Sequence, residues 1–133
     1  RALFLAGERC DPDTLEWAQN QLRIPVIDHW WQTETGWPIG SNCIGLDMLP
    51  IKPGSCARPV PGYDVRVLDD AGHEMESTAI GNIAVKLPLP PGCLPTLWHN
   101  EVGYRQTYLD AYPGYYHTAD AGYSRGFGKV GFK

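Results

Sequence analysis

The sequence predicts an α/β protein in which a strand–helix–strand unit of a parallel sheet precedes a small, antiparallel, barrel-like β-rich part. Three observations lead to this prediction. Two short apolar segments, residues 2–6 and 25–27, flank a segment with helical apolar spacing. Beyond residue 37, proline and glycine recur and divide the chain into short alternating segments. The length of 133 residues suits about one domain.

Local signals set the limits of the first three elements. Apolar residues 2–6 are typical of a short buried strand that ends in a turn. Asp11 is a favourable N-cap and Pro12 suits the first helical position, which predicts a helix from there to about Arg23. Residues 25–27 predict the second strand.

Polar loops follow both predicted strands. Residues 7–9 follow the first strand, and residues 28–36 follow the second. Because the carboxyl ends of parallel strands meet at one edge of a sheet, we expect the two loops to face each other across one crevice.

The remainder of the chain predicts short antiparallel strands. They are expected at residues 63–68, 81–87 and 114–120, with a turn at 69–72 and a short helix at 101–109. The closing residues, 124–133, carry three basic residues, three glycines and no acid, and we expect this atypical basic tail to be frayed.

Composition argues against several classes of function. A formal net charge of −4 without a long basic run argues against a nucleic-acid partner. No apolar stretch approaches the roughly 20 residues that span a membrane, so we expect no membrane partner. Four cysteines are scattered without a C-x-x-C motif. Free thiols in a cytoplasmic or mitochondrial-matrix protein that is not secreted are therefore expected, and disulfides in a secreted module are the alternative.

Several side chains of the crevice suit nucleotide chemistry. Thr33 and Glu34 follow a strand end, where amides and a hydroxyl can hold a phosphate and a lone carboxylate is a natural Mg²⁺ ligand. Trp30 and Trp31 offer flat walls for a base or a short acyl chain. Asp120 could accept hydrogen bonds from both ribose hydroxyls. Plainer interpretations also fit: Thr33 and Glu34 could lie in a solvated loop, the two tryptophans could belong to the core, and Asp120 could form a turn.

The sequence lacks the motifs of covalent catalysis and of triphosphate cradles. It has no G-x-S-x-G segment, no cysteine with a histidine at motif spacing, no glycine-rich loop with lysine and no G-x-G-x-x-G. If the crevice handles a nucleotide triphosphate, the main phosphate cradle must lie outside these residues.

Five segments, in order, resemble the AMP-forming acyl-CoA synthetases of the adenylate-forming superfamily. Residues 30–36, WWQTETG, resemble the core nucleotide-binding motif. Gly7-Glu8-Arg9 resembles the Gly-Glu-Pro turn that contacts adenine, with Arg9 in place of proline. Residues 59–63, 81–85 and 116–122 resemble three further segments, with Ala119 at a usual glycine. The resemblance covers residues 1 to about 123.

The resemblance implies both a fold and a reaction. The chain would be part of an N-terminal AMP-binding domain, with the sheet and crevice in residues 1–36 and the β-rich part in residues 37–123. A carboxylate and ATP, with Mg²⁺, would give acyl-AMP and pyrophosphate, and CoA as co-substrate would then displace AMP. WWQTETG is typical of acetyl- and propionyl-CoA synthetases, and residues 36–39 with 87–92 favour propionate.

By position, the resemblance implies a role for each matching residue. Adenine would lie against Gly7, Glu8, Arg9, Asp28, His29 and Trp30; Gln32 and Thr33 would bind the phosphate, Glu34 the Mg²⁺ and Asp120 the ribose; Trp31 and Gly36 would form the acyl pocket. Trp31 at the pocket floor would exclude long chains, since extra methylenes against a packed ring are costly.

We expect this chain to be a fragment that does not complete the reaction alone. It opens on Arg1, and it lacks the family's phosphate loop and the C-terminal domain with its adenylation lysine. Its partners would then be a small carboxylate, ATP and the missing portions of its parent chain. Two alternatives are an aromatic-faced, carbohydrate-binding β module and a non-functional structural remnant.

Overall fold

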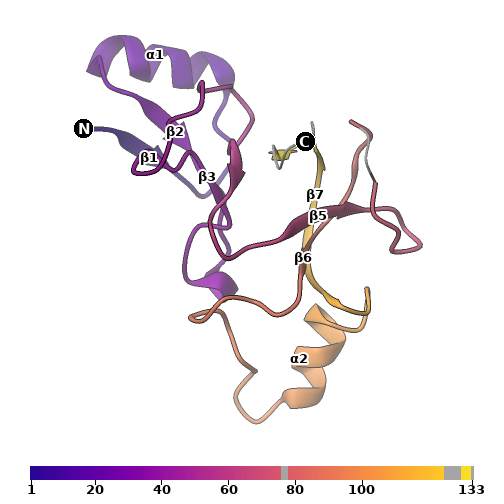
Figure 1. The fold of residues 1–133 in the computed structure, drawn as a ribbon. Helices are drawn as coiled ribbons and strands as arrows, with labels where there is room; N and C mark the ends of the chain where they lie inside the picture. Colours follow the sequence, from indigo (N-terminus) through magenta and orange to yellow (C-terminus); the bar gives the residue numbers. More distant parts are fainter. Residues whose placement is uncertain (76–77, 125–129, 133) are drawn as a thin grey trace.

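The computed structural model describes residues 1–75, 78–124 and 130–132. Its first part is the expected strand–helix–strand unit, formed by β1 (Leu3–Leu5), α1 (Pro12–Leu22) and β2 (Val26–Asp28). β1 and β2 are parallel, with Leu3 opposite Val26. Figure 1 shows α1 at one end of the molecule and α2 (Glu101–Tyr108) at the other, with the main sheet between them.

Local sequence accounts for the limits of α1. The Asp11 carboxylate accepts a hydrogen bond from the backbone N–H of Thr14 at 3.1 Å, and Pro12 occupies the first turn. Arg23 ends the helix in a left-handed conformation with a φ of 53°, and its N–H donates to the carbonyl of Gln19. Within the described ranges, neither this helix nor any other has the length and apolar character needed to cross a membrane.

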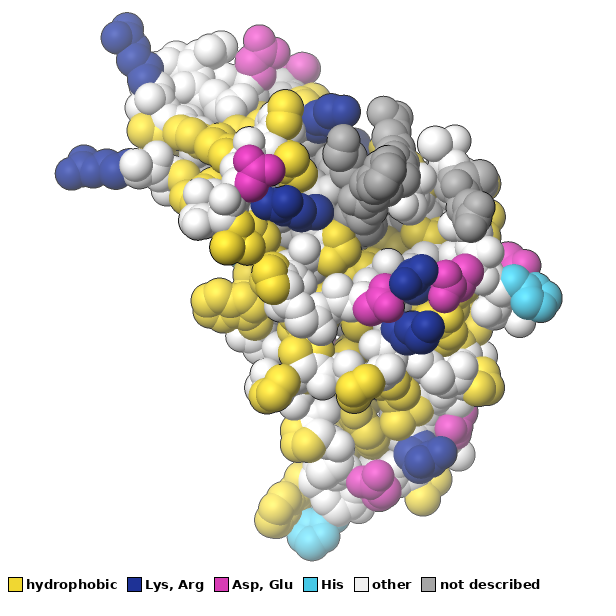
Figure 2. Space-filling view, in the orientation of Figure 1, with side chains coloured by type: hydrophobic (Ala, Val, Ile, Leu, Met, Phe, Trp, Pro, Cys, Tyr) yellow, Lys and Arg dark blue, Asp and Glu magenta, His cyan; other side chains and the backbone are white. Residues whose placement is uncertain are grey.

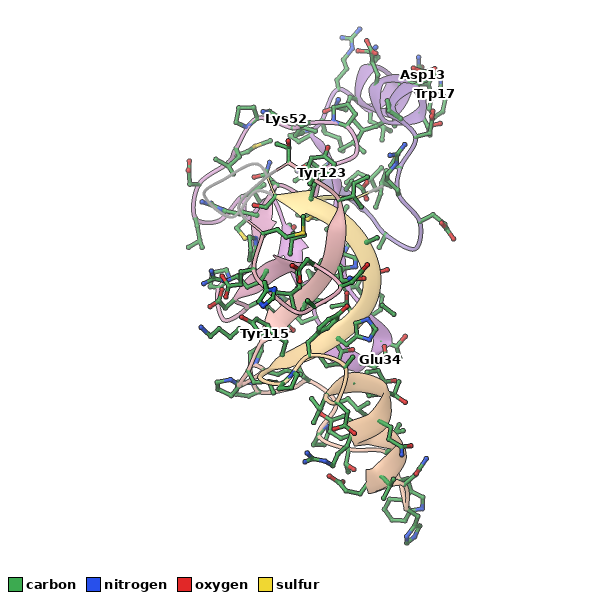
Figure 3. All side chains as sticks on the ribbon, turned by 90° about the vertical axis from the view of Figure 1, so that its right-hand side faces the viewer. Asp13, Trp17, Glu34, Lys52, Tyr115 and Tyr123 are labelled. Atoms are coloured by element: carbon green, nitrogen blue, oxygen red, sulfur yellow. The ribbon has the colours of Figure 1, made fainter. Side chains whose placement is uncertain are left out.

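α1 packs on the parallel pair through a small apolar cluster. Leu15 is 1% exposed and lies in this cluster with Ala18 and Val26. Trp17 lies on the outer face of α1, away from this cluster (Figure 3). β1 is less buried than expected: Leu3 and Leu5 pack against this cluster, whereas Phe4 lies on the opposite face of the sheet and is 44% exposed.

The remainder of the described chain is mostly antiparallel β structure. A two-stranded sheet pairs β3 (Gly40–Ser41) with β4 (Arg58–Pro59). The main sheet has the order β5 (Val65–Leu68), β6 (Gly81–Lys86), β7 (Tyr115–Ser124) and β8 (Val130–Phe132). Together with the parallel pair, these sheets confirm a mixed α/β fold.

The prediction of a frayed tail at residues 124–133 is wrong for part of that segment. Ser124 belongs to β7, and β8 pairs antiparallel with β7, with Phe132 opposite Gly122. The free N–H and C=O groups of a strand edge can pair with the backbone of almost any sequence, so the glycine-rich composition did not prevent this strand. Residues 125–129 and 133 of the predicted tail lie outside the described residues.

A bulge interrupts the pairing of β6 with β7. The register of this pair shifts once, and Ala119 of β7 has a left-handed φ of 60°. The Thr118 hydroxyl donates to the carbonyl of Ile83 at 2.6 Å and accepts from the N–H of Asp120 at 3.1 Å. The bulge therefore bends β7 just before Asp120 and is held by a side-chain hydroxyl.

One apolar cluster connects the loop after β2 with the main sheet. Its buried members are Ile39, Tyr63, Val85 and Tyr116. Trp30 packs against this cluster and against a second one formed by Cys56 and Ile83. The indole of Trp30 thus fixes the segment that follows β2 against the face of the sheet.

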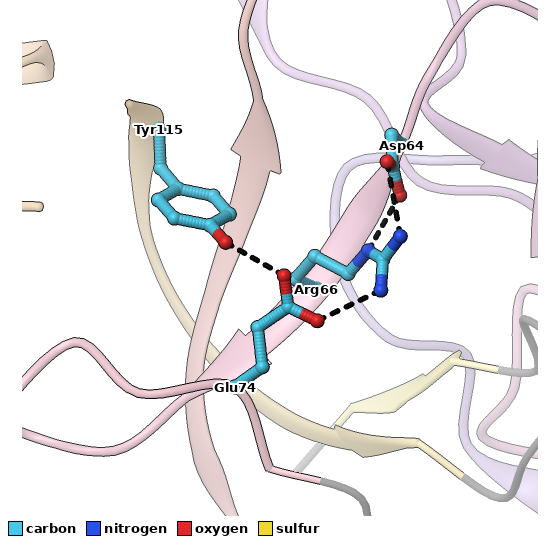
Figure 4. Close-up of polar contacts among 4 residues, drawn as sticks. All are labelled: Asp64, Arg66, Glu74 and Tyr115. Carbon is cyan, nitrogen blue, oxygen red and sulfur yellow. Dashed lines mark hydrogen bonds and ion pairs between the residues drawn. The ribbon is translucent and has the colours of Figure 1, made fainter. Parts of the chain in front are cut away.

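A polar network lies on the surface of the main sheet. The Arg66 guanidinium donates to both carboxylate oxygens of Asp64, at 2.6 and 3.1 Å, and to Glu74 Oε2 at 2.8 Å (Figure 4). The Tyr115 hydroxyl donates to Glu74 Oε1 at 2.7 Å. Figure 2 shows acidic and basic side chains interleaved over this region. The network links β5, the turn after it and β7.

Candidate functional site

A cavity of about 410 Å³ lies where three loops converge. Its lining comes from the loop after β1 (Gly7, Glu8, Arg9), the end of β2 and the following loop (Asp28, His29, Trp30, Trp31), and the bulge of β7 (Ala119, Asp120, Ala121). The two loops after the parallel strands therefore meet, as the βαβ pattern predicts. Gly7 turns the first loop with a φ of 106°, which favours glycine.

Asp28 connects two of these loops at the base of the cavity. Its side chain is buried, and its Oδ2 accepts a hydrogen bond from the backbone N–H of Cys10 at 3.0 Å. Burial raises the pKa of Asp28 above its ordinary value, and the Cys10 hydrogen bond together with the charges of His29 and Arg9 offsets part of this rise. The carboxylate ties the start of α1 to the end of β2.

Asp120 projects into the same cavity from the bulge. Its Oδ2 accepts hydrogen bonds from the indole Nε1 of Trp30 at 3.1 Å and from the carboxamide Nε2 of Gln32 at 2.8 Å. A carboxylate held by two fixed donors is well ordered, and its second oxygen can accept hydrogen bonds from a ligand hydroxyl.

Gln32 is not among the residues that line this cavity, and its side chain is hydrogen-bonded within the protein. Its Nε2 also donates to the carbonyl of Thr118 at 2.6 Å, and its Oε1 accepts a hydrogen bond from the Tyr116 hydroxyl at 2.9 Å. Both amide hydrogens and one lone pair are therefore used internally. The Gln32 backbone N–H donates to Thr35 Oγ1 at 3.1 Å.

Thr33 and Glu34 lie in η1 (Thr33–Thr35), a 3₁₀ turn directly after Gln32. Thr33 is exposed, and Glu34 Oε1 accepts a hydrogen bond from the Tyr108 hydroxyl of α2 at 2.9 Å. This bond to a carboxylate raises the pKa of Tyr108, and burial adds to the rise. Figure 3 shows Glu34 beside α2, remote from α1.

Glu34 is a single carboxylate at this turn. Among the described residues, no group of three or more His, Cys, Asp or Glu side chains could hold a metal ion. Mg²⁺ commonly uses one or two protein carboxylates together with phosphate oxygens, so this donor fits Mg²⁺ that arrives with a nucleotide better than a resident metal centre.

A second, largely apolar cavity of about 630 Å³ adjoins the first. Trp31 and Gly36, the two residues predicted for an acyl pocket, both line it. His29 and Trp31 border both cavities, and His29 packs edge-on against Phe4 with ring centroids 5.6 Å apart. The structure thus brings a polar and an apolar cavity together at two side chains of one loop.

Sequence reasoning missed three residues that organise the site. Tyr116 and Thr118 hold Gln32, and Tyr108 holds Glu34. Tyr116 and Thr118 fall within a segment quoted for its resemblance, residues 116–122, so their identity was visible. Their contacts with Gln32 were not visible in the sequence, because Gln32 lies 84 positions from Tyr116 and 86 from Thr118.

Comparison with known proteins gives a family match and relatives that agree with each other. A family model described as AMP-binding enzyme matches residues 1–90. The chain is 52% identical over 124 residues to acyl-CoA synthetase short-chain family member 3, mitochondrial, of Homo sapiens, covering 92% of this chain and 18% of that protein. It is 43% identical over 107 residues to propionate–CoA ligase of Escherichia coli (strain K12), covering 80% of this chain and 17% of that protein.

The chain therefore spans about a fifth of the length of these relatives. The family match nevertheless covers well over half of the 133 residues, including every predicted site residue except Asp120. On this basis the chain belongs to the family of AMP-binding enzymes and is homologous to the short-chain acyl-CoA synthetases.

Proposed function

We propose that this chain forms part of a short-chain acyl-CoA synthetase that activates propionate or acetate with ATP and passes the acyl group to CoA. The observation that carries the proposal is the meeting of two unlike cavities at His29 and Trp31. An acyl-adenylate has the same division, because a polar nucleotide is joined directly to a short apolar chain. Residues 1–123 would then be part of the N-terminal AMP-binding domain, with residues 37–123 as its barrel-like portion.

The polar cavity suits the nucleoside. Adenine would lie among residues 7–9 and 28–30, and Asp120 would accept hydrogen bonds from the ribose hydroxyls. Phosphate would lie near Thr33, whose exposed side chain is accessible at η1. Glu34 would ligate Mg²⁺ that accompanies the phosphates, after exchanging its hydrogen bond from Tyr108.

The apolar cavity suits a short acyl chain. Trp31 and Gly36 border it, and Trp31 also borders the polar cavity, where the carboxyl carbon of the acyl group would have to lie. An indole at this junction limits the length of the chain that can enter. The similarity to a protein named propionate–CoA ligase supports propionate as the preferred acid.

The carbohydrate-binding alternative gains no support from the cysteines, since all four are free thiols in the structure. Catalysis by this chain alone is not expected, because its sequence contains no glycine-rich phosphate loop with lysine. Incubation with propionate, ATP, Mg²⁺ and CoA should therefore give no propionyl-CoA, and product formation by the purified chain would contradict this expectation.

Calorimetric titration with a nonhydrolysable propionyl-adenylate mimic tests the binding site. The chain should bind the mimic, and Thr33→Ala should weaken binding by about tenfold through loss of a phosphate contact. Thr14→Ala, on the exposed start of α1, is the matched control and should leave affinity unchanged. Absence of heat at millimolar ligand would refute an adenylate site within these residues.

A further inference from the structure

We propose that Gln32 is a positioning residue for Asp120 and not a phosphate ligand, and that the Tyr116 hydroxyl sets the orientation of its carboxamide. This inference rests on the proposed function, because it concerns how the nucleoside cavity is organised. Both polar atoms of the Gln32 side chain have hydrogen-bond partners within the protein, two for Nε2 and one for Oε1.

The carboxamide of Gln32 has one orientation that satisfies its surroundings. Nε2 faces two acceptors, the Thr118 carbonyl at 2.6 Å and Asp120 Oδ2 at 2.8 Å. Oε1 faces the hydroxyl of Tyr116 at 2.9 Å. A reversed amide would place its oxygen against a carbonyl and a carboxylate, so three neighbours select the same rotamer.

This orientation leaves Gln32 without a free hydrogen-bond donor for a phosphate. Both hydrogens of the Gln32 amide are donated within the protein, and its backbone N–H already donates to Thr35 Oγ1 at 3.1 Å. Gln32 therefore has no remaining donor for an anionic oxygen unless these bonds break. Its carboxamide instead connects η1 to the bulge of β7.

The arrangement leaves one carboxylate oxygen of Asp120 available to a ligand. Oδ2 accepts from Gln32 and from the Trp30 indole, whereas Oδ1 has no hydrogen-bond donor among the residues the structure describes. Asp120 lines the cavity, so Oδ1 is the carboxylate oxygen left to accept from a bound hydroxyl pair. Fixed donors on one oxygen reduce the rotational freedom that ligand binding would otherwise have to remove.

Two stacked tyrosines support the arrangement. The rings of Tyr108 and Tyr116 are stacked with centroids 5.5 Å apart and an interplanar angle of 9°. Tyr116 is 1% exposed and donates to Gln32, while Tyr108 donates to Glu34. The pair thus holds Gln32 toward Asp120 and Glu34 beside α2.

Three ligands distinguish positioning from the other roles that Gln32 could have. AMP, 2′,3′-dideoxy-AMP and adenosine are titrated against the wild-type chain, Gln32→Met and Tyr116→Phe. If the proposal holds, both variants lose about tenfold of the preference for AMP over the dideoxy analogue and keep the preference for AMP over adenosine. If Gln32 binds the phosphate, the variants should instead lose the preference for AMP over adenosine and keep the preference for AMP over the dideoxy analogue. An equal loss of affinity for all three ligands would indicate a merely structural role. Either result overturns the proposal.

The matched control is Tyr115→Phe. Tyr115 precedes Tyr116 on β7, but its hydroxyl donates to Glu74 at 2.7 Å in the surface network. Removal of this hydroxyl should leave both ligand preferences unchanged. Asp120→Asn should abolish the preference for the ribose diol, and adding Gln32→Met to it should cause no further loss of that preference.

A measurement without ligand tests the arrangement itself. Exchange of the Gln32 side-chain amide hydrogens with solvent, followed by NMR, should be slow in the wild-type chain and about tenfold faster in Tyr116→Phe. Equal rates in the two proteins would overturn the proposal. If the wild-type chain binds none of the three ligands, the proposed function fails for this chain, and the exchange rates alone decide whether Gln32 is held against Asp120.

Discussion

Ala119 shows how one residue shapes the candidate site. Its φ of 60° lies in the left-handed region, which costs an L-residue other than glycine about 1–2 kcal/mol. The surrounding contacts maintain it, since Thr118 bonds to both Ile83 and the N–H of Asp120. The strained residue immediately precedes the carboxylate that enters the cavity.

Replacing Ala119 by glycine should therefore stabilise the protein. We expect Ala119→Gly to raise the free energy of unfolding by about 1 kcal/mol, because relief of strain exceeds the added freedom of the unfolded chain. Ala121→Gly is the control at an ordinary β7 position and should lower it by about 0.5–1 kcal/mol. Urea titration measures the free energy of unfolding of both variants. A lower value for Ala119→Gly than for the wild-type chain would contradict the assigned strain at Ala119.

Two aspartates should influence stability with opposite dependence on pH. Burial raises the pKa of Asp28 in the folded state, so folding favours its protonated form and stability declines as pH rises through that range. The hydrogen bonds from Arg66 lower the pKa of Asp64, so its contribution is present above the unfolded pKa and is lost as pH falls.

Replacing each aspartate by asparagine tests these opposite pH dependences of stability. Asp28→Asn should gain stability relative to the wild-type chain as pH increases from about 4 to 7, and its Oδ1 can still accept from Cys10. Asp64→Asn should lose stability relative to the wild-type chain over the same range. Thermal unfolding at several pH values gives both trends, and parallel curves for the two variants would exclude the assigned causes.

At the scale of elements, α1 depends on few contacts. Its inner face contributes Leu15 and Ala18 to a cluster with Val26, and its outer face leaves Trp17 64% exposed. The cap at Asp11 and the left-handed Arg23 define where the helix begins and ends. Its attachment to the parallel strands therefore relies largely on one large buried side chain.

Truncation of that side chain should be costly. We expect Leu15→Ala to lower the free energy of unfolding by about 2–5 kcal/mol, through lost transfer energy and the cavity left behind. Trp17→Ala removes more atoms from an exposed position and should change stability by less than about 0.5 kcal/mol. Similar losses for the two variants in urea titrations would show that the buried cluster does not hold α1.

For the whole molecule, the important feature is the junction of the two cavities at Trp31. Trp31→Ala should shift binding from a propionyl-adenylate mimic toward a hexanoyl-adenylate mimic by about tenfold or more, because the shorter side chain leaves space for a longer chain in the proposed acyl pocket. Trp98→Ala, at a residue 87% exposed, should leave this ratio unchanged. An unchanged ratio for Trp31→Ala in calorimetry would remove Trp31 from the acyl pocket.

Much of the fold followed from local signals. The cap at Asp11 with Pro12 placed α1 correctly, and the apolar segments located β1 and β2 to within a residue or two. The parallel pairing also brought residues 7–9 and 28–31 to one cavity, as expected. β8 was missed because edge pairing uses backbone groups that every residue carries, so the side-chain pattern gives no signal.

By itself, the sequence determined the strand–helix–strand unit, the polar loops that follow its two strands and the family resemblance, because each depends on residues close together in the chain. The tertiary structure decided which side chains act together. It placed Gln32 between Tyr116 and Asp120 and put Ala119 in the left-handed region. Such bonds join residues 84 and 88 positions apart, and only packing of the loop after β2 on the main sheet brings their atoms within hydrogen-bonding distance.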